Sequence, residues 1–104
     1  MIARWWKGRV RAAEVDEYVR YVEETGIRGI TAVAGNRLAL VLTRVEGDEA
    51  EVGVLSLWDS MEAIRAFAGE NPDIAVYYPE DDRWLLDAPR RVAHFDVPEA
   101  AGVG

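Results

Sequence analysis

The chain has 104 residues, half of them apolar and 30% charged, which is the composition of a single globular domain. Its formal net charge of −7 argues against a nucleic-acid partner, because neutralising phosphates needs a basic face. It contains no cysteine and one histidine, which excludes disulfides, thiolate nucleophiles, cysteine-based clusters and a multi-histidine metal site within one subunit.

No apolar run approaches the roughly 18 residues of a membrane-spanning helix. Residues 1–7 become charged too early for a secretory signal. We therefore expect a cytoplasmic protein with no membrane partner.

A strand is predicted over residues 2–10, with Arg4 and Trp6 on one face and Trp5 on the other. Because each face carries a tryptophan, neither face is purely solvated. One tryptophan should serve the core under the helices and the other the opposite side, and the sequence leaves open which does which.

A helix is predicted over residues 13–25. Its apolar residues recur at i, i+3, i+4 and i+7 and form one stripe, Val15, Tyr18, Val19 and Val22. Gly26 is the expected C-terminal stop of this helix, and a loop containing Gly29 and Gly35 should follow.

Two further strands are predicted over residues 37–45 and 51–58, joined by a polar turn at 46–49. Apolar side chains occur on both faces of each strand, which indicates strands that are covered on both sides.

A second helix is predicted over residues 60–68, with Asp59 as its N-cap and Glu62 completing a capping box. The helix should break near Gly69. The stretch that follows, residues 71–86, is rich in aromatic and acidic side chains and is expected to be irregular with short helical turns.

A last strand is predicted over residues 90–97. Residues 1–98 should thus form one domain, and residues 99–104 a flexible C-terminal tail.

The order strand, helix, strand, strand, helix, strand predicts an α+β, ferredoxin-like βαββαβ fold with a four-stranded antiparallel sheet. Right-handed crossovers place both helices on one face. The opposite face is apolar as well and must be covered, most simply by the same sheet of a second copy. We therefore expect a homodimer.

At residues 57–63, Leu-Trp-Asp-Ser-Met-Glu-Ala, the chain resembles the antibiotic biosynthesis monooxygenase-like family of dimeric α/β barrels. In that family a strand ends in a Trp-x-Ser step before an acidic helix start. The resemblance in element order extends over about residues 2–97. It implies a ferredoxin-like half of a barrel dimer and one of three activities: cofactor-free oxygenation of polycyclic phenols, heme degradation, or none yet assigned.

The heme-degrading branch of that family carries an asparagine, a tryptophan and an iron-binding histidine. By position these fall at about Trp6, Phe67 and Tyr77, so none of the three matches. The resemblance therefore favours an activity with no cofactor. A tyrosinate can ligate heme iron, so Tyr77 leaves heme binding open but not favoured.

His94, Tyr77 and Arg4 are the candidate catalytic residues. His94 would titrate near neutral pH as a general base, or it could be a structural histidine in the core or at the dimer seam. Arg4 could neutralise an anionic substrate or phenolate, or it could pair with a carboxylate across the sheet.

Aromatic side chains are the candidates for substrate binding: Trp6, Trp58, Phe67, Tyr78 and Trp84. Trp58 is the motif tryptophan and could equally be a packing anchor. The aromatic residues of segment 75–84 could stack on a flat ligand or could plug the end of the barrel with their own rings. The adjacent acids Glu80, Asp81 and Asp82 are interpreted as a solvated face.

The leading hypothesis is a cofactor-independent monooxygenase that acts on a small planar aromatic substrate of the phenol or quinone type. The substrate would supply the electrons, His94 or Tyr77 would accept its proton, and Arg4 would steady the anion. One alternative is a dimeric small-molecule or heme-binding protein without catalysis. Another is a pocket filled by its own side chains, which a cavity below about 300 Å³ would favour.

Overall fold

The structure, a computed structural model, describes residues 1–102; Val103 and Gly104, the end of the predicted tail, lie outside the described residues. Its strands are β1 (Ile2–Arg11), β2 (Asn36–Glu46), β3 (Glu49–Trp58) and β4 (Ala93–Asp96). Its helical segments are η1 (Ala12–Glu14), α1 (Val15–Val22), η2 (Glu23–Ile27), α2 (Arg28–Thr31), α3 (Met61–Ala68) and η3 (Asp81–Arg83).

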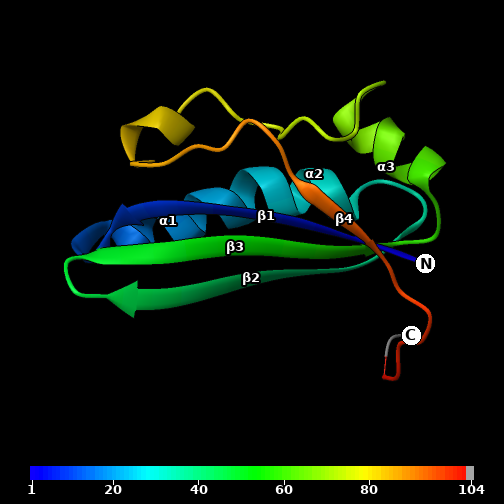
Figure 1. The fold of residues 1–104 in the computed structure, drawn as a ribbon. Helices are drawn as coiled ribbons and strands as arrows, with labels where there is room; N and C mark the ends of the chain where they lie inside the picture. The colour runs from blue at the N-terminus through cyan, green and yellow to red at the C-terminus, as the bar shows by residue number, and fades with distance from the viewer. Residues whose placement is uncertain (103–104) are drawn as a thin grey trace.

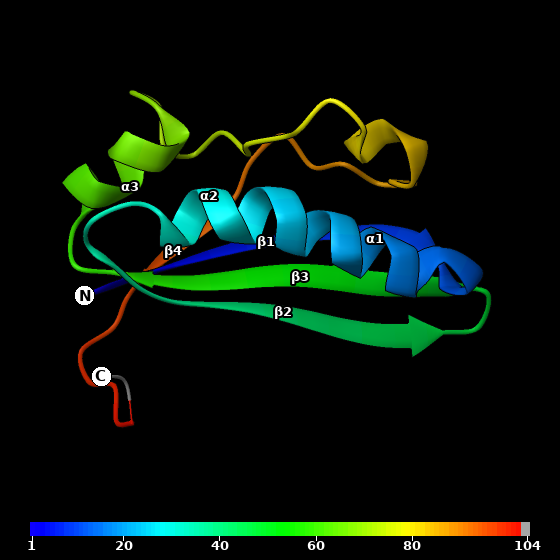
Figure 2. The same ribbon diagram turned by 180° about the vertical axis from the view of Figure 1, so that it is seen from behind.

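The four strands form one antiparallel sheet in the order β2-β3-β1-β4. The helical run from α1 to α2 lies along one face of this sheet, behind the strands in Figure 1 and in front of them in Figure 2. The predicted α+β, ferredoxin-like βαββαβ fold is therefore confirmed. No helix within residues 1–102 has both the length and the apolarity to cross a membrane.

Between α3 and β4 the chain makes a long excursion, which we call the strap (residues 70–92). In Figure 1 it runs in yellow from α3 along the molecule to the turn η3 and returns in orange to β4. The irregular stretch that the sequence predicts over residues 71–86 is confirmed.

The two faces of β1 have different surroundings. Trp6 and Val10 point toward the helices, where Val10 is fully buried and Trp6 packs against the same cluster. Trp5 lies on the opposite, helix-free face, where its ring fills the space that a side chain at Gly53 of β3 would need. The question that the sequence left open is thereby answered: Trp6 serves the core under the helices.

The first helix is longer than predicted, and Gly26 does not stop it. The helical run continues through the π-helical segment η2, which contains Gly26, into α2, which contains Gly29. It ends before Gly35, whose φ of +95° is the left-handed conformation that glycine favours. Tertiary packing explains the error, because Gly29 faces the Tyr78 hydroxyl, only 2.6 Å from where a Cβ atom would lie.

The predicted cap of α3 is also wrong. The hydroxyl of Ser60 accepts the hydrogen bond from the backbone N–H of Ala63 at 3.1 Å, and Ser60 has the extended conformation of an N-cap. The Asp59 carboxylate instead accepts a hydrogen bond from Arg37 at 2.6 Å. The predicted end of α3 is confirmed by Gly69, whose φ is +92°.

Strand β4 is shorter than the predicted strand over 90–97. Residues 90–92, the start of the predicted strand, belong to the strap and pair with its earlier part instead of with β1. Ala75 donates to the carbonyl of Arg90 at 2.8 Å, and Val92 donates to that of Asp73 at 2.9 Å. Only four residues of β4 remain to pair with β1, and they set His94 directly opposite Arg4.

Two buried clusters lie between the sheet and the helices. One contains Val10, Tyr18, Val22, Ala50, Val52 and Trp84. The other contains Ile30, Trp58 and Ile64. The space between the two clusters is where the pocket described next opens.

Candidate ligand pocket

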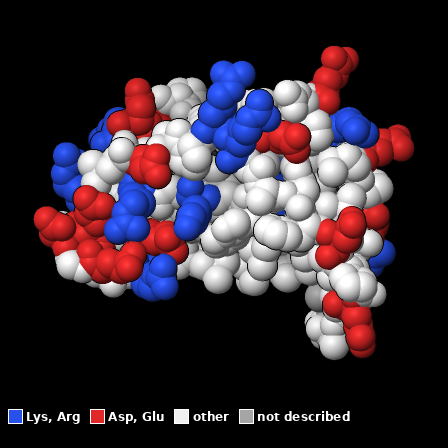
Figure 3. Space-filling model, in the orientation of Figure 1, with Lys and Arg blue, Asp and Glu red and all other residues white. Residues whose placement is uncertain are grey.

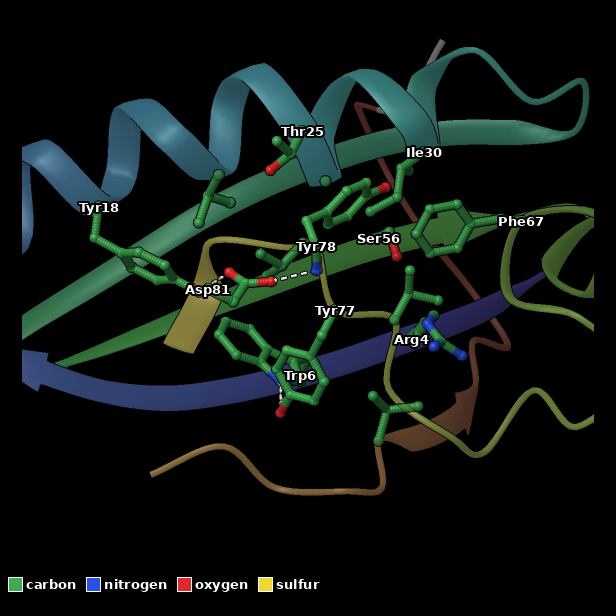
Figure 4. A pocket seen from close by; sticks show the side chains of 15 residues that line it. Arg4, Trp6, Tyr18, Thr25, Ile30, Ser56, Phe67, Tyr77, Tyr78 and Asp81 are labelled. Carbon is green, nitrogen blue, oxygen red and sulfur yellow. Dashed lines mark hydrogen bonds between the residues drawn. The ribbon is translucent and has the colours of Figure 1, made fainter. Parts of the chain in front are cut away.

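A pocket lies between the sheet, the helical run, α3 and the strap (Figure 4). The sheet contributes Arg4, Trp6, Val54 and Ser56; the helices contribute Tyr18, Val22, Thr25, Gly26, Ile30 and Phe67; and the strap contributes Val76, Tyr77, Tyr78, Asp81 and Val92. Aromatic and aliphatic walls with a few polar groups are typical of small-molecule sites.

Little free space remains in the pocket. The free space inside it is about 60 Å³, and the concavity including its mouth toward solvent is about 540 Å³. Ligand pockets have volumes of about 300 Å³ or more. As it stands, the pocket is largely filled by its own side chains, as the last of the alternatives from the sequence expects. A planar aromatic molecule therefore needs a movement of the side chains that form the outer wall, of which Tyr77 and Tyr78 are the largest.

Arg4 is the buried basic side chain of the pocket, with 4% of its surface exposed. Its guanidinium donates to the carbonyls of Pro72 and Ile74 and to the His94 ring, and it lies 5.9 Å from the centre of the Phe67 ring. Arg4 takes no part in the ion pairs of residues 1–102. Burial lowers the pKa of Arg4 to about 10, which keeps it charged at neutral pH.

His94 lies beside this guanidinium and not in the wall of the pocket. Its Nε2 is 3.0 Å from Arg4 Nη1, and its Nδ1 is 3.2 Å from a carboxylate oxygen of Asp73. Burial, reinforced by the charge of Arg4, lowers the pKa of His94 below its usual value, although Asp73 opposes the shift. The ring is therefore neutral at pH 7.

Tyr77 and Trp6 form the lower wall of the pocket in Figure 4. The indole N–H of Trp6 donates to the Tyr77 hydroxyl at 3.0 Å, and that hydroxyl donates to the carbonyl of Pro89. The two rings meet edge to face with centroids 6.1 Å apart. Burial raises the pKa of Tyr77, which favours the neutral phenol.

Asp81 is the polar residue that the sequence did not reveal. The predicted solvated face is wrong for Asp81, which is 6% exposed because Tyr18 covers it, and right for Glu80 and Asp82, which are exposed. Tyr18 donates to one of its oxygens at 2.8 Å and the backbone N–H of Tyr78 donates to the other at 2.6 Å. No local signal distinguishes Asp81 from its acidic neighbours, because Tyr18, which covers it, is 63 positions earlier in the chain.

The predicted site residues divide into three groups. Arg4, Trp6, Phe67, Tyr77 and Tyr78 line one pocket, although they come from three separate parts of the chain. His94 touches that pocket through Arg4. Trp58 and Trp84 lie apart from it.

Trp58 and Trp84 pack in the core. Trp58 is fully buried, donates to the Ser56 hydroxyl at 2.8 Å and lies against Phe67, so it supports one wall from behind. The Trp84 ring packs at a tilt in the other cluster, with its centroid 5.0 Å from that of Tyr21 and 5.6 Å from that of Tyr18. Both contacts are those of packing anchors.

Solved structures of other proteins share this fold. No protein-family model and no curated protein matches the sequence. A solved structure assigned as an antibiotic biosynthesis monooxygenase from Bacillus cereus superposes with a TM-score of 0.67 at 19% identity, covering 96% of this chain and 97% of that one. A point mutant of MhuD with two manganese protoporphyrin IX molecules bound per active site superposes with a TM-score of 0.60 at 17% identity, covering 98% and 99%. The chain therefore has the antibiotic biosynthesis monooxygenase-like fold over nearly its whole length.

Proposed function

We propose that the pocket binds a small planar aromatic compound of the phenol or quinone type and that the protein oxygenates it without a cofactor. The observation that carries this proposal is Arg4: a buried guanidinium without an ion-pair partner among residues 1–102, at one end of an aromatic-lined pocket. Asp73 acts on Arg4 only from beyond ion-pair distance, so an anionic ring oxygen would supply the negative charge in direct contact with the guanidinium. The Bacillus cereus neighbour, by its assigned name, supports the same class of reaction.

The proposed reaction needs no reductant other than its substrate. A ring hydroxyl loses a proton, and the resulting anion passes an electron pair to O2 as a carbon–oxygen bond forms. The hydroperoxide then loses water and leaves a carbonyl. The balance is SH2 + O2 → SO + H2O, in which the substrate supplies the electrons that reduce one oxygen atom to water.

Arg4 would stabilise the anion in this reaction, and Trp6, Phe67 and Tyr78 would hold the ring. Asp81 is the carboxylate in the wall and is the proposed proton acceptor, because each of its oxygens accepts one hydrogen bond and keeps a second lone pair. The earlier candidates are less suited to that role. The Nε2 lone pair of His94 accepts from Arg4, and the raised pKa of Tyr77 favours its phenol form.

Oxygen uptake with dihydroxynaphthalenes tests this function directly. Substitution Arg4→Gln should lower turnover by roughly 10²-fold, the scale for one lost charge-stabilising donor, whereas Arg90→Gln on the exposed strap should change nothing. With 18O2, one labelled atom should appear in the product. Tight binding without oxygen uptake would instead identify a non-catalytic binder.

Heme binding is the second candidate, since the MhuD structure contains a metalloporphyrin. The side chains in this pocket do not fit heme. The Tyr77 hydroxyl is held by Trp6 and Pro89, and His94 Nε2 is held by Arg4, so neither atom is free to ligate iron. A hemin titration decides: a saturable Soret shift at one hemin per chain would favour this candidate, and a non-saturating response would exclude it.

We also propose that the protein is a cytoplasmic homodimer joined through the helix-free face of the sheet. Leucines of β2 are exposed on that face, Leu40 by 43% and Leu42 by 44%, and Phe95 of β4 by 54%. Exposed apolar surface of this kind typically marks an interface.

A further inference from the structure

The contacts of His94 define its proton state. Arginine side chains carry only donors, so Arg4 Nη1, 3.0 Å from His94 Nε2, must donate to a ring nitrogen that bears no proton. The proton of the neutral ring is then on Nδ1, from which it is donated to Asp73 at 3.2 Å. Hydrogen bonds thus connect Asp73 to His94 and His94 to Arg4. This series leads from the surface, where the Asp73 side chain is 58% exposed, to the pocket.

Protonation of His94 would turn its attractive contact with Arg4 into a repulsive one. A proton on Nε2 removes the acceptor and sets a cation against the guanidinium at 3.0 Å. The contacts of Arg4 with the carbonyls of Pro72 and Ile74 are on the same strap that carries Asp73, so the guanidinium would be drawn away from β4 and toward the strap.

We propose that His94 is a positioning residue: its neutral ring holds Arg4 at the end of the pocket, and its protonation disrupts this arrangement and releases an anionic planar ligand. The inference rests on the proposed binding function for the ligand, and on geometry alone for the hold on Arg4. His94 would therefore not touch the ligand itself and would act on it through Arg4.

The charged groups around His94 are few. Arg4 faces it from β1, directly opposite in the register, and Asp73 faces it from the strap. Asp96, two residues along β4, lies on the same face of the sheet, opposite Ile2. The ring is 10% exposed, so protons can reach it. The lowered pKa of His94 agrees with a ring that is kept neutral down to mildly acidic pH.

Nuclear magnetic resonance tests the hold on Arg4 without any ligand, because His94 is the only histidine in the chain. Imidazole 15N shifts should show the Nδ1–H tautomer at pH 7.5 and a single titration below about pH 6.5. The guanidinium signals of Arg4 should shift with the same midpoint, and they should not shift in His94→Gln. An Nε2–H tautomer, or guanidinium signals indifferent to the titration, would overturn the inference.

Binding of 1-hydroxy-2-naphthoate, which stays anionic between pH 5.0 and 7.5, tests the release. We expect the affinity of the wild-type protein to fall at least about tenfold from the upper to the lower end of that range. His94→Gln keeps an acceptor for Arg4 and cannot titrate, so it should bind with little pH dependence. His94→Phe, with no acceptor, should bind weakly at both pH values.

Neutral 1-naphthol serves as the matched probe, and its affinity should change little with pH in all three proteins. Equal pH dependence of naphthoate binding in wild type and His94→Gln would overturn the proposed release. Failure of both probes to bind wild type at any pH would instead overturn the proposed function, and the tautomer and guanidinium signals would then alone uphold or overturn the role of His94.

Discussion

Tyr78 lies over the helix at a place where only glycine leaves room for it. A Cβ atom at Gly29 would lie 2.6 Å from the Tyr78 hydroxyl and 3.3 Å from the Phe67 ring. At Gly26 the nearest atom of Tyr78 would be 4.0 Å away, an ordinary contact. The two glycines stand three residues apart in one helical run, so they form a matched pair for testing how Tyr78 closes the pocket.

Alanine at either position removes the helix penalty of glycine, about 0.5–1 kcal/mol. We expect Gly26→Ala to stabilise the protein by up to about 1 kcal/mol. The Gly29→Ala variant should be about 1–3 kcal/mol less stable than the Gly26→Ala variant, because the added methyl group displaces the Tyr78 side chain from its packed position. The same displacement should speed the association of 1-naphthol.

Urea unfolding of both variants measures the difference, and stopped-flow fluorescence measures the association. If Gly29→Ala were as stable as Gly26→Ala and bound naphthol no faster, Tyr78 would not be the closing side chain. The cavity of about 60 Å³ would then need another opening.

At the scale of elements, local pattern was enough to predict β1, β2 and β3. The predicted bounds of β2 and β3 differ from the observed ones by one or two residues at most, because alternation and a turn at Gly47, with φ +67°, are properties of neighbouring residues. The same reasoning predicted α3 within one residue. The strands define the sheet, and the order of strands and helices along the chain defines the fold.

The features that the sequence did not predict depend on contacts between residues far apart in the chain. The helix runs through Gly26 and Gly29 because the strap packs against it, and the burial of Asp81 depends on Tyr18. The sequence also predicted both Arg4 and His94 as site residues, but no pattern shows that one donates to the other. Five of the fifteen residues that line the pocket were therefore predicted as site residues, and the contacts between them were not predicted.

The N-cap of α3 is a second test at this scale. Ser60→Ala removes the hydrogen bond to Ala63 and should cost about 1 kcal/mol, within the usual range for a lost cap. Asp59→Ala removes an exposed ion pair with Arg37 and should cost no more than about 0.5 kcal/mol. Chemical unfolding of the two variants compares them, and the reverse order would restore Asp59 as the cap.

Asp81 ties the strap to the first helix. Asp81→Ala leaves the hydroxyl of buried Tyr18 and the N–H of Tyr78 without their acceptor, which should cost about 2–4 kcal/mol in the free energy of unfolding. Asp82→Ala, one residue away and exposed, should stay within about 0.5 kcal/mol of the wild type. Hydrogen exchange should be faster throughout the strap in the first variant only. If the strap amides exchanged equally slowly in both variants, the strap would be held by its aromatic contacts instead.

At the scale of the whole molecule, the sheet has one face covered by helices and one uncovered. Side chains of the uncovered face fall into rows across the strands in register, with Leu40, Leu55 and Trp5 in one row. The two rows nearest the β2–β3 turn are charged: the first contains Glu46, Glu49 and Arg11, and the second contains Arg44, Glu51 and Arg9. Figure 3 shows the same division, with charged side chains gathered at the hairpin end and a broad uncharged area over the middle of the sheet.

Such a division predicts how two copies would meet. Apolar rows would pack against each other at the centre, and the charged rows would remain at the rim, as in other protein interfaces. Leu40→Lys places a charge in the centre of that contact and should convert a dimer into a monomer. Ala66→Lys adds the same charge on the exposed side of α3 and should leave the assembly unchanged.

Sedimentation velocity at several concentrations measures both variants against the wild type. The lysine would be buried without a partner in the dimer, a cost of several kcal/mol per subunit that a typical interface cannot absorb. A wild-type protein that sediments as a monomer at all concentrations would contradict the proposed dimer, as would a Leu40→Lys variant that remains dimeric. In the monomeric case, the leucines of β2 would be open to solvent, and we would expect the isolated chain to bind hydrophobic dyes on this face as well as in the pocket.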